Sequence, residues 1–242
     1  MANGAIGQVS QGLINSGLKI QFFSVSTGFM VEFPMIVKSF SDKYQSDWNS
    51  QQVFGRMDPI ATFKGTKRTI ALTFRVLSEN QQESKYNMQK ISSLMNFLYP
   101  NYSFNPTSEA ATIASSPILK IKFINWMQDT KSTNTSTSQT DRTAFSSDAQ
   151  DSGLMGYVDG FTFNPAMDKI IDKDEEGIYP RDSDISFNFT VLHSHKLGFD
   201  IGSLKNNAIN TSNTLKNNLL SPNTKFPYNL DQVAARKILG GK

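Results

Sequence analysis

RMDPIATFKGTKRTIALTFRV, at residues 56–76, is the stretch that decides the fold of this chain, together with the run that follows it to LYPNY at 98–102. Its second half alternates with period two, and one face carries only apolar residues: Ile70, Leu72, Phe74 and Val76. A strand with one buried face has this pattern, because successive side chains point to opposite sides of a sheet. We therefore predict a loop that leads into a strand over residues 66–76.

An amphipathic helix is expected after this strand. Ser78 gives an N-cap signal before a run rich in Gln, Glu and Lys, and Pro100 closes the segment. Apolar residues recur on one helical face at Met88, Ile91, Met95 and Leu98. We predict a helix over residues 78–99, which at about 1.5 Å per residue is roughly 30 Å long and can cover a sheet.

Other segments of the chain also alternate like strands. An early hairpin is predicted around the Ser26-Thr27-Gly28 turn signal, and a strand or extended arm runs from Met35 toward Trp48. Three later strands are expected at residues 119–123, 157–163 and 185–191. The order of strands, helix and strands predicts an α+β fold, as an antiparallel β-sandwich or partly closed barrel with one flanking helix.

Three parts are expected along the chain: an N-terminal arm at residues 1–17, a β domain at 18–203 and a C-terminal arm at 204–242. Residues 128–152 are almost wholly polar and predict a long loop inside the domain, because they offer little apolar surface to offset their ordering entropy. The C-terminal arm is rich in Asn, and a short helix is predicted at 230–239. We expect this arm to become ordered only against another protein.

Composition narrows the classes of function. The formal net charge is +3, from 24 basic and 21 acidic residues spread along the chain, so no nucleic-acid footprint stands out. The absence of cysteine excludes disulfides and thiolate metal sites, which fits folding in the cytoplasm. Residues 1–17 lack a basic start and a long apolar run, so neither a signal peptide nor a membrane segment is expected.

Candidate metal ligands are few. His193 and His195 are spaced as a metal pair could be, but no third ligand accompanies them, and we interpret them as hydrogen-bonding residues at a strand end. Asp172, Asp174 and Glu176 imitate the start of a calcium loop whose twelfth position holds serine where a bidentate Glu is required. We interpret that segment as a solvated acidic turn. No metal or cofactor is expected.

Catalytic signals are equally sparse. Arg56 and Asp58 could form a pair in an active-site loop, but Asp58-Pro59 is more typical of a turn. The chain has no Walker spacing around Lys64, no Gly-x-Ser-x-Gly elbow and no cysteine nucleophile. A hydrolase built on Asp58 and Asp159 remains a distant hypothesis, and we expect a protein that is not an enzyme.

Four segments together resemble virion structural proteins of contractile-tailed bacteriophages: Phe54–Ile60, the 66–76 strand, the helix that closes on Leu98-Tyr99-Pro100, and Leu192–Asp200. The resemblance covers most of residues 54–102 and again 153–200. It implies the tail-tube and baseplate-hub group, in which a β-sandwich or barrel with a flanking helix packs side by side into a ring around the tail channel.

The resemblance also implies partners and a place of action. The expected partners are copies of this chain in a ring, neighbouring tail-tube and baseplate proteins, and genome DNA that passes the lumen without specific binding. The expected location is the virion tail or baseplate, assembled in the host cytoplasm.

The leading hypothesis is a non-enzymatic ring component at the tube-to-baseplate junction, a hub or tube initiator that acts by joining subunits. A tail-tube subunit is the near alternative. A carbohydrate-binding β-sandwich module, with Trp48, Trp126, Tyr99 and Tyr102 as stacking platforms, is the more distant one. The interface candidates are Arg56, Asp58, Phe226, Tyr228, Leu230, Val233, Ile238 and Leu239.

Overall fold

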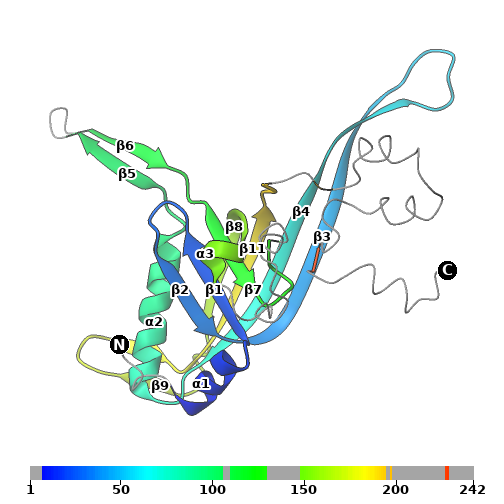
Figure 1. The fold of residues 1–242 in the computed structure, drawn as a ribbon. Helices are drawn as coiled ribbons and strands as arrows, with labels where there is room; N and C mark the ends of the chain where they lie inside the picture. The colour runs from blue at the N-terminus through cyan, green and yellow to red at the C-terminus, as the bar shows by residue number, and fades with distance from the viewer. Residues whose placement is uncertain (1–6, 106–109, 130–147, 195–196, 198–226, 229–242) are drawn as a thin grey trace, which may run out of the picture.

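The computed structural model describes residues 7–105, 110–129, 148–194, 197 and 227–228. A seven-stranded antiparallel sheet in the order β2-β1-β7-β8-β11-β4-β3 forms the body, and two-stranded hairpins β5–β6 and β9–β10 project from it (Figure 1). The predicted α+β class is confirmed. The elements are α1 (Gln8–Asn15), β1 (Lys19–Ser24), β2 (Met30–Pro34), β3 (Ile36–Gln51), β4 (Ile60–Leu77), α2 (Gln81–Asn96), β5 (Asn101–Asn105), β6 (Ala110–Ser115), β7 (Leu119–Phe123), α3 (Ala149–Ser152), β8 (Leu154–Pro165), β9 (Ile171–Lys173), β10 (Ile178–Pro180) and β11 (Asp182–Val191).

The large sheet folds over onto itself. Strands β1 and β4 lie four spacings apart in the sheet order, which would separate them by about 19 Å if the sheet were flat. The ring centroids of Phe22 on β1 and Phe74 on β4 are nevertheless only 6.5 Å apart. The ring centroid of Phe33 on β2 lies 6.2 Å from that of Phe74. The two halves of the sheet therefore face each other as a sandwich, and the edges β2 and β3 stay unjoined, so the barrel is not closed.

The alternating strands predicted from sequence supply this core. In β4 the four apolar residues of the predicted face are at most 2% exposed. The early hairpin is confirmed as β1–β2, with Ile20 paired to Phe33 and Phe22 to Val31. Its turn contains Gly28 at a φ of +74°, a left-handed conformation that glycine adopts without steric cost.

The predicted helix exists but is shorter at both ends. Its N-cap is Asn80 instead of Ser78, because the Asn80 side chain accepts the Glu83 backbone N–H at 2.8 Å while Glu83 accepts the Glu79 N–H. The two bonds resemble a capping box, except that Glu83 accepts the N–H of the residue before the N-cap, and together they fix the first turn of α2. The buried face includes Ile91, as predicted, and also Leu94, which was not among the predicted positions.

Two short helices were not predicted. Within the expected N-terminal arm, α1 packs near β2, and the Glu79 carboxylate accepts the backbone N–H groups of Gln8 and Val9 at its start. Within the expected polar loop, α3 packs on β1 and β7, and its buried Ala149 donates a backbone hydrogen bond to the Gln21 side chain at 3.0 Å. The C-terminal end of the 128–152 segment is therefore fixed to the sheet, and its residues 130–147 lie outside the described chain.

Candidate interaction surface

The most prominent surface feature is a long arm formed by the outer halves of β3 and β4. The two strands pair continuously from Ile36–Arg75 to Gln51–Ile60. Between Lys43 and Lys67 every residue is exposed except Gly65, which is half-buried. At about 3.3 Å per residue, the stretch of β4 from Ile60 to Arg68 is roughly 27 Å long. Figure 1 shows the arm rising away from the body, while β5–β6 projects from the other side.

The arm has one aromatic face. Side chains two apart on a strand share a face, so Tyr44 and Trp48 of β3 follow the same face as Phe40, which packs against the core. Their residues are 42% and 57% exposed. The alternate residues of β3 on the opposite face are polar: Ser39, Ser41, Lys43, Gln45, Asp47, Asn49 and Gln51. The core-facing side of the sheet thus continues into the arm, where the body no longer covers it.

A β-bulge keeps the aromatic residues of the two strands together. Asp47 pairs with Gly65, but Trp48 pairs with Phe63, so Lys64 is an extra residue in β4. Without this shift Phe63 would point to the polar face, because a one-residue slip reverses a side chain. With it, the Trp48 and Phe63 rings meet at a centroid distance of 5.1 Å and an interplanar angle of 61°.

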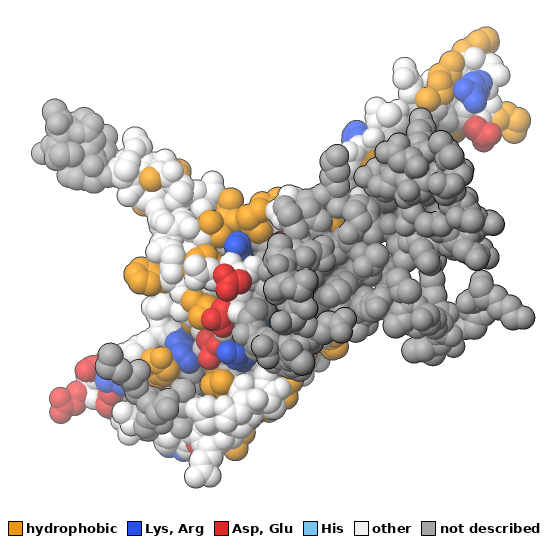
Figure 2. Space-filling view, viewed as in Figure 1, with side chains coloured by type: hydrophobic (Ala, Val, Ile, Leu, Met, Phe, Trp, Pro, Cys, Tyr) orange, Lys and Arg blue, Asp and Glu red, His pale blue; other side chains and the backbone are white. Residues whose placement is uncertain are grey.

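The tip of the arm carries the most exposed apolar side chains. A turn is closed by the Arg56 N–H, which donates to the Val53 carbonyl at 3.2 Å, with Gly55 at a φ of +83°. Phe54 is 106% and Met57 is 97% exposed. Figure 2 shows hydrophobic side chains gathered at this far end. The candidates Arg56 and Asp58 both lie here, so the structure brings them to the tip of an exposed hairpin.

A buried ion pair marks the base of the arm. Arg68 of β4 binds Asp42 of β3 with two hydrogen bonds, at 3.0 and 2.8 Å, and their side chains are 1% and 3% exposed. The same guanidinium lies 5.4 Å from the centroid of the Tyr44 ring and donates to the Trp126 carbonyl at 3.4 Å. Such a planar, bidentate ion pair fixes the geometry of both strands where the arm leaves the body.

Tyr228 completes this cluster. Its hydroxyl donates to Asp42 Oδ2 at 3.1 Å, and its backbone carbonyl accepts from Asn125 Nδ2 at 3.0 Å. Burial, reinforced by the nearby Asp42 carboxylate, raises the pKa of Tyr228, so the phenol remains a donor. Of the C-terminal interface candidates, Tyr228 therefore contacts its own domain. The others lie outside the described residues, namely Phe226, Leu230, Val233, Ile238 and Leu239.

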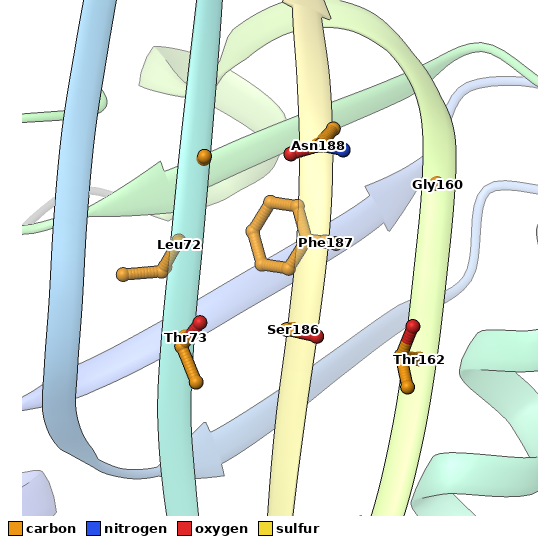
Figure 3. Close-up of a pocket in the computed structure, with 8 residues that line it drawn as sticks. Leu72, Thr73, Gly160, Thr162, Ser186, Phe187 and Asn188 are labelled. Atoms are coloured by element: carbon orange, nitrogen blue, oxygen red, sulfur yellow. The ribbon is translucent and has the colours of Figure 1, made fainter.

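A shallow cavity of about 130 Å³ opens on the strands β4, β11 and β8 (Figure 3). Its lining contains small and hydroxyl-bearing residues, among them Thr73, Gly160, Thr162, Ser186 and Asn188. No His, Asp, Glu, Lys or Cys lines it, so its hydroxyl groups have no neighbouring base in the cavity. The cavity offers no arrangement for nucleophilic catalysis.

The acidic segment imitating a calcium loop is occupied by protein groups. Asp172 accepts two hydrogen bonds from Arg181, at 2.7 and 2.8 Å. Asp174 binds Lys85 at 3.1 Å and accepts the backbone N–H groups of Glu176 and Gly177. The carboxylates thus hold the β9–β10 hairpin against α2. In the part of the chain that the structure describes, no group of three or more His, Cys, Asp or Glu residues suits a metal ion.

The remaining sequence candidates do not converge. His193 follows the end of β11 and His195 lies outside the described residues. Asp58 lies at the tip of the arm, whereas Asp159 lies on β8 in the body. The proposed stacking platforms come from different elements: Trp48 lies on the arm, Trp126 packs on Phe40 at a centroid distance of 4.9 Å, Tyr99 lies between α2 and β5, and Tyr102 lies on β5. Among the described residues, no helix has the length and apolar character needed to cross a membrane.

Comparisons with known proteins found a similar solved structure and no family or curated relative. No protein family matches the sequence, and no curated protein matches it. Among solved structures, the chain is similar to the Dit protein (gp 19.1) of phage SPP1, described as a paradigm of the hub adsorption apparatus in phages that infect Gram-positive hosts. The sequence identity is 10% and the TM-score 0.33. The match covers 74% of this chain and 52% of that one, so this chain spans about half the length of the Dit protein. A likeness of this degree carries no argument about function.

Proposed function

We propose that this protein is a structural subunit of a contractile phage tail, placed in a ring at the tube-to-baseplate junction, and that it acts by binding protein subunits. The sequence resemblance of residues 54–102 to tail-tube and baseplate-hub proteins supplies the class. The observation that carries the proposal is the β3–β4 arm, whose aromatic face continues the core face of the sheet beyond the body.

The exposed side chains of the arm are typical of a surface that binds another subunit. Monomeric proteins seldom expose large contiguous apolar patches, and aromatic residues and Met are enriched where subunits meet. Trp48, Phe54, Met57 and Phe63 are all more than half exposed along one arm. An isolated two-stranded hairpin is marginally stable in water. An adjacent copy that covers this face would both bury the aromatic residues and support the arm.

The positions of the projections favour a ring over a two-fold dimer. The arm and the β5–β6 hairpin leave the body on different sides (Figure 1), and β5–β6 exposes Tyr102 and Ile113 at 62% and 66%. Different surfaces on the two sides of a subunit suit head-to-tail contacts, which close into rings when the rotation permits. A hub or tube initiator is our preferred assignment, because two unlike projections suit contacts to unlike neighbours. A tail-tube subunit is the alternative.

The test removes the apolar tip without touching the body. The double variant Phe54→Ser/Met57→Ser should keep the melting temperature of the parent within about 2 °C, because surface changes away from packed groups usually alter stability by less than about 0.5 kcal/mol. Association, measured by light scattering across a concentration series and by incorporation into tail particles, should be lost.

A matched control separates the tip from general surface hydrophobicity. Met167 and Ile170 are 63% and 64% exposed on the connection after β8. The double variant Met167→Ser/Ile170→Ser should associate like the parent. Normal assembly by the tip variant, or equal loss in both variants, would refute the assignment of the arm as the interface.

A further inference from the structure

The cluster at the base of the arm has the features of a binding site for a short peptide segment. Asp42 Oδ2 accepts hydrogen bonds from Arg68, from the Tyr44 hydroxyl at 3.2 Å and from the Tyr228 hydroxyl at 3.1 Å. Asn125, in the turn after β7, holds the backbone carbonyl of Tyr228. Asp42 therefore binds the side chain of Tyr228, and Asn125 binds its main chain. We call Asp42, Tyr44, Arg68 and Asn125 the tyrosine seat.

The seat belongs to the body, while its occupant comes from far along the chain. Strand β11 ends at Val191, Ser194 still contacts Asp129, and the next contact described is at Tyr228. The 32 residues from 195 to 226 lie between, a length that spans at most roughly 115 Å when extended. Chain length alone therefore permits Tyr228 to reach the seat of its own subunit or the seat of an adjacent one.

We propose that the tyrosine seat is an exchangeable docking site, filled by the chain's own Tyr228 segment in the free subunit and by the Tyr228 segment of a second copy in the assembled ring. This inference rests on the proposed function for the presence of adjacent copies. Its chemistry is independent of that function, because a buried carboxylate and an amide donor recognise a phenol and a peptide carbonyl in either arrangement.

Two features favour a second copy as the occupant in the ring. Tyr44 belongs both to the seat and to the aromatic face of the arm, so the seat is continuous with the surface proposed to bind the adjacent subunit. Each chain also carries one seat and one segment. In a closed ring, passing every segment to the next subunit leaves no seat empty and replaces each hydrogen bond by an identical one.

The experiment uses the full chain, which has no cysteine of its own. Ser46→Cys, on the same face of β3 as Asp42 and Tyr44 but outside the seat, and Pro227→Cys place thiols on the two sides of the contact. A short bis-maleimide joins thiols that lie close together. In the double variant at low concentration, we expect a cross-link within one chain, seen as a monomer of altered mobility in a denaturing gel. When the two single variants are mixed and assembled, we expect a covalent dimer.

Controls define what counts as specific. Ser103→Cys on β5, used in place of Ser46→Cys, should give less than a tenth of the cross-linked product. Adding Tyr228→Phe to the cross-linking pair should slow both reactions about tenfold, because it removes one hydrogen bond to a charged group. Circular dichroism of each variant confirms that the sheet is intact.

The outcomes separate the docking proposal from the proposed function. No cross-link within the chain, in a variant that keeps its sheet, would overturn the seat itself. An oligomer that yields only within-chain cross-links would overturn the exchange and leave the ring function standing. A chain that stays monomeric at every concentration and enters no tail particle would overturn the ring function and the exchange together.

Discussion

The two halves of β4 share one strand and one pairing partner but differ in every other respect. From Arg68 to Leu77 buried and half-buried residues alternate, and the buried set faces the aromatic core. From Ile60 to Lys67 both faces are open to solvent. The ladder with β3 continues through both halves, shifted at the Lys64 bulge and, near the body end, between Val37 and Ser39. Pairing therefore persists where burial stops, and the inner half supplies stability while the outer half supplies surface.

The largest contrast should come from removing one ring from the inner half. Phe74 is fully buried, and its ring lies 6.4 Å from Phe187. Phe74→Ala should cost roughly 3–5 kcal/mol and prevent soluble accumulation at 37 °C. Thermal denaturation of protein expressed at low temperature measures the loss. A melting temperature within a few degrees of the parent would show that the inner half is not the stabilising part.

An ion pair on the inner half of β4 should stabilise the protein more than an ion pair on the outer half. In the body, hydrogen bonds from Arg75 lower the pKa of Asp182 to about 2, against the opposing effect of burial. A depressed carboxyl pKa adds stability above about pH 4 that is lost as the pH falls toward 2, and Asp182→Asn should remove about 2 kcal/mol at neutral pH.

The matching pair on the arm joins Lys64 to Asp47 at 3.9 Å, and both side chains are mostly exposed. Exposed pairs contribute about 0–1 kcal/mol. Asp47→Asn should therefore leave the denaturation midpoint at pH 7 nearly unchanged. Equal shifts for Asp47→Asn and Asp182→Asn in urea denaturation would contradict the division of β4 into two functional halves.

A buried lysine in the body, Lys122, should destabilise the protein at neutral pH, whereas Asp182 stabilises it. Burial lowers the pKa of Lys122 to about 8. The unfolded chain then binds more protons than the folded one between about pH 8 and 10.5, so stability rises with pH in that window. Lys122→Met should stabilise the protein by the order of 1 kcal/mol at pH 7, with the gain shrinking toward pH 10. Lys67→Met, on the exposed arm, is the control for removing a lysine and should change the stability at pH 7 by less than about 0.5 kcal/mol.

A small change in stability, but a large change in association, is expected from removing an aromatic residue on the outer half. Phe63 is 53% exposed and contacts Trp48 across the strands. Cross-strand pairs of this kind contribute about 0.2–1 kcal/mol, so Phe63→Ala should lower the melting temperature only slightly. Its effect on association should be large. A loss of stability comparable to that of Phe74→Ala would mean that the arm packs against its own body.

The difference in burial between the inner and outer halves of β4 also explains which elements could be predicted from the sequence. Alternation revealed the inner half of β4, β1–β2, β7 and β11, because one face of each strand is buried. Residues 60–65 were expected to form a loop and instead belong to β4, since a strand exposed on both faces needs no alternation. The true start of α2 was missed because Ser78 and Asn80 both qualify as caps, and only the hydrogen bond from the Glu83 backbone N–H to the Asn80 side chain selects Asn80.

The candidate sites were predictable only in part. A turn was expected at Asp58-Pro59, which lies in the connection between β3 and β4, but the position of this connection at the end of a long arm depends on how far the paired strands extend beyond the body. Arg68 resembled any surface arginine in sequence, yet it is 1% exposed because Asp42 neutralises it across the ladder. Tyr228 stood out as an apolar anchor in a polar arm, but no local pattern links it to a carboxylate on β3.

The bulge at Lys64 has a consequence for how such an arm can change during evolution. Because the side chains alternate strictly, adding one residue to β4 beyond the bulge exchanges its aromatic and polar faces, whereas adding two preserves them. Length can therefore vary in steps of two residues per strand, about 6–7 Å at a time, with the binding face retained. The parity of insertions, more than the identity of individual residues, would decide which homologous arms still fit the same neighbour.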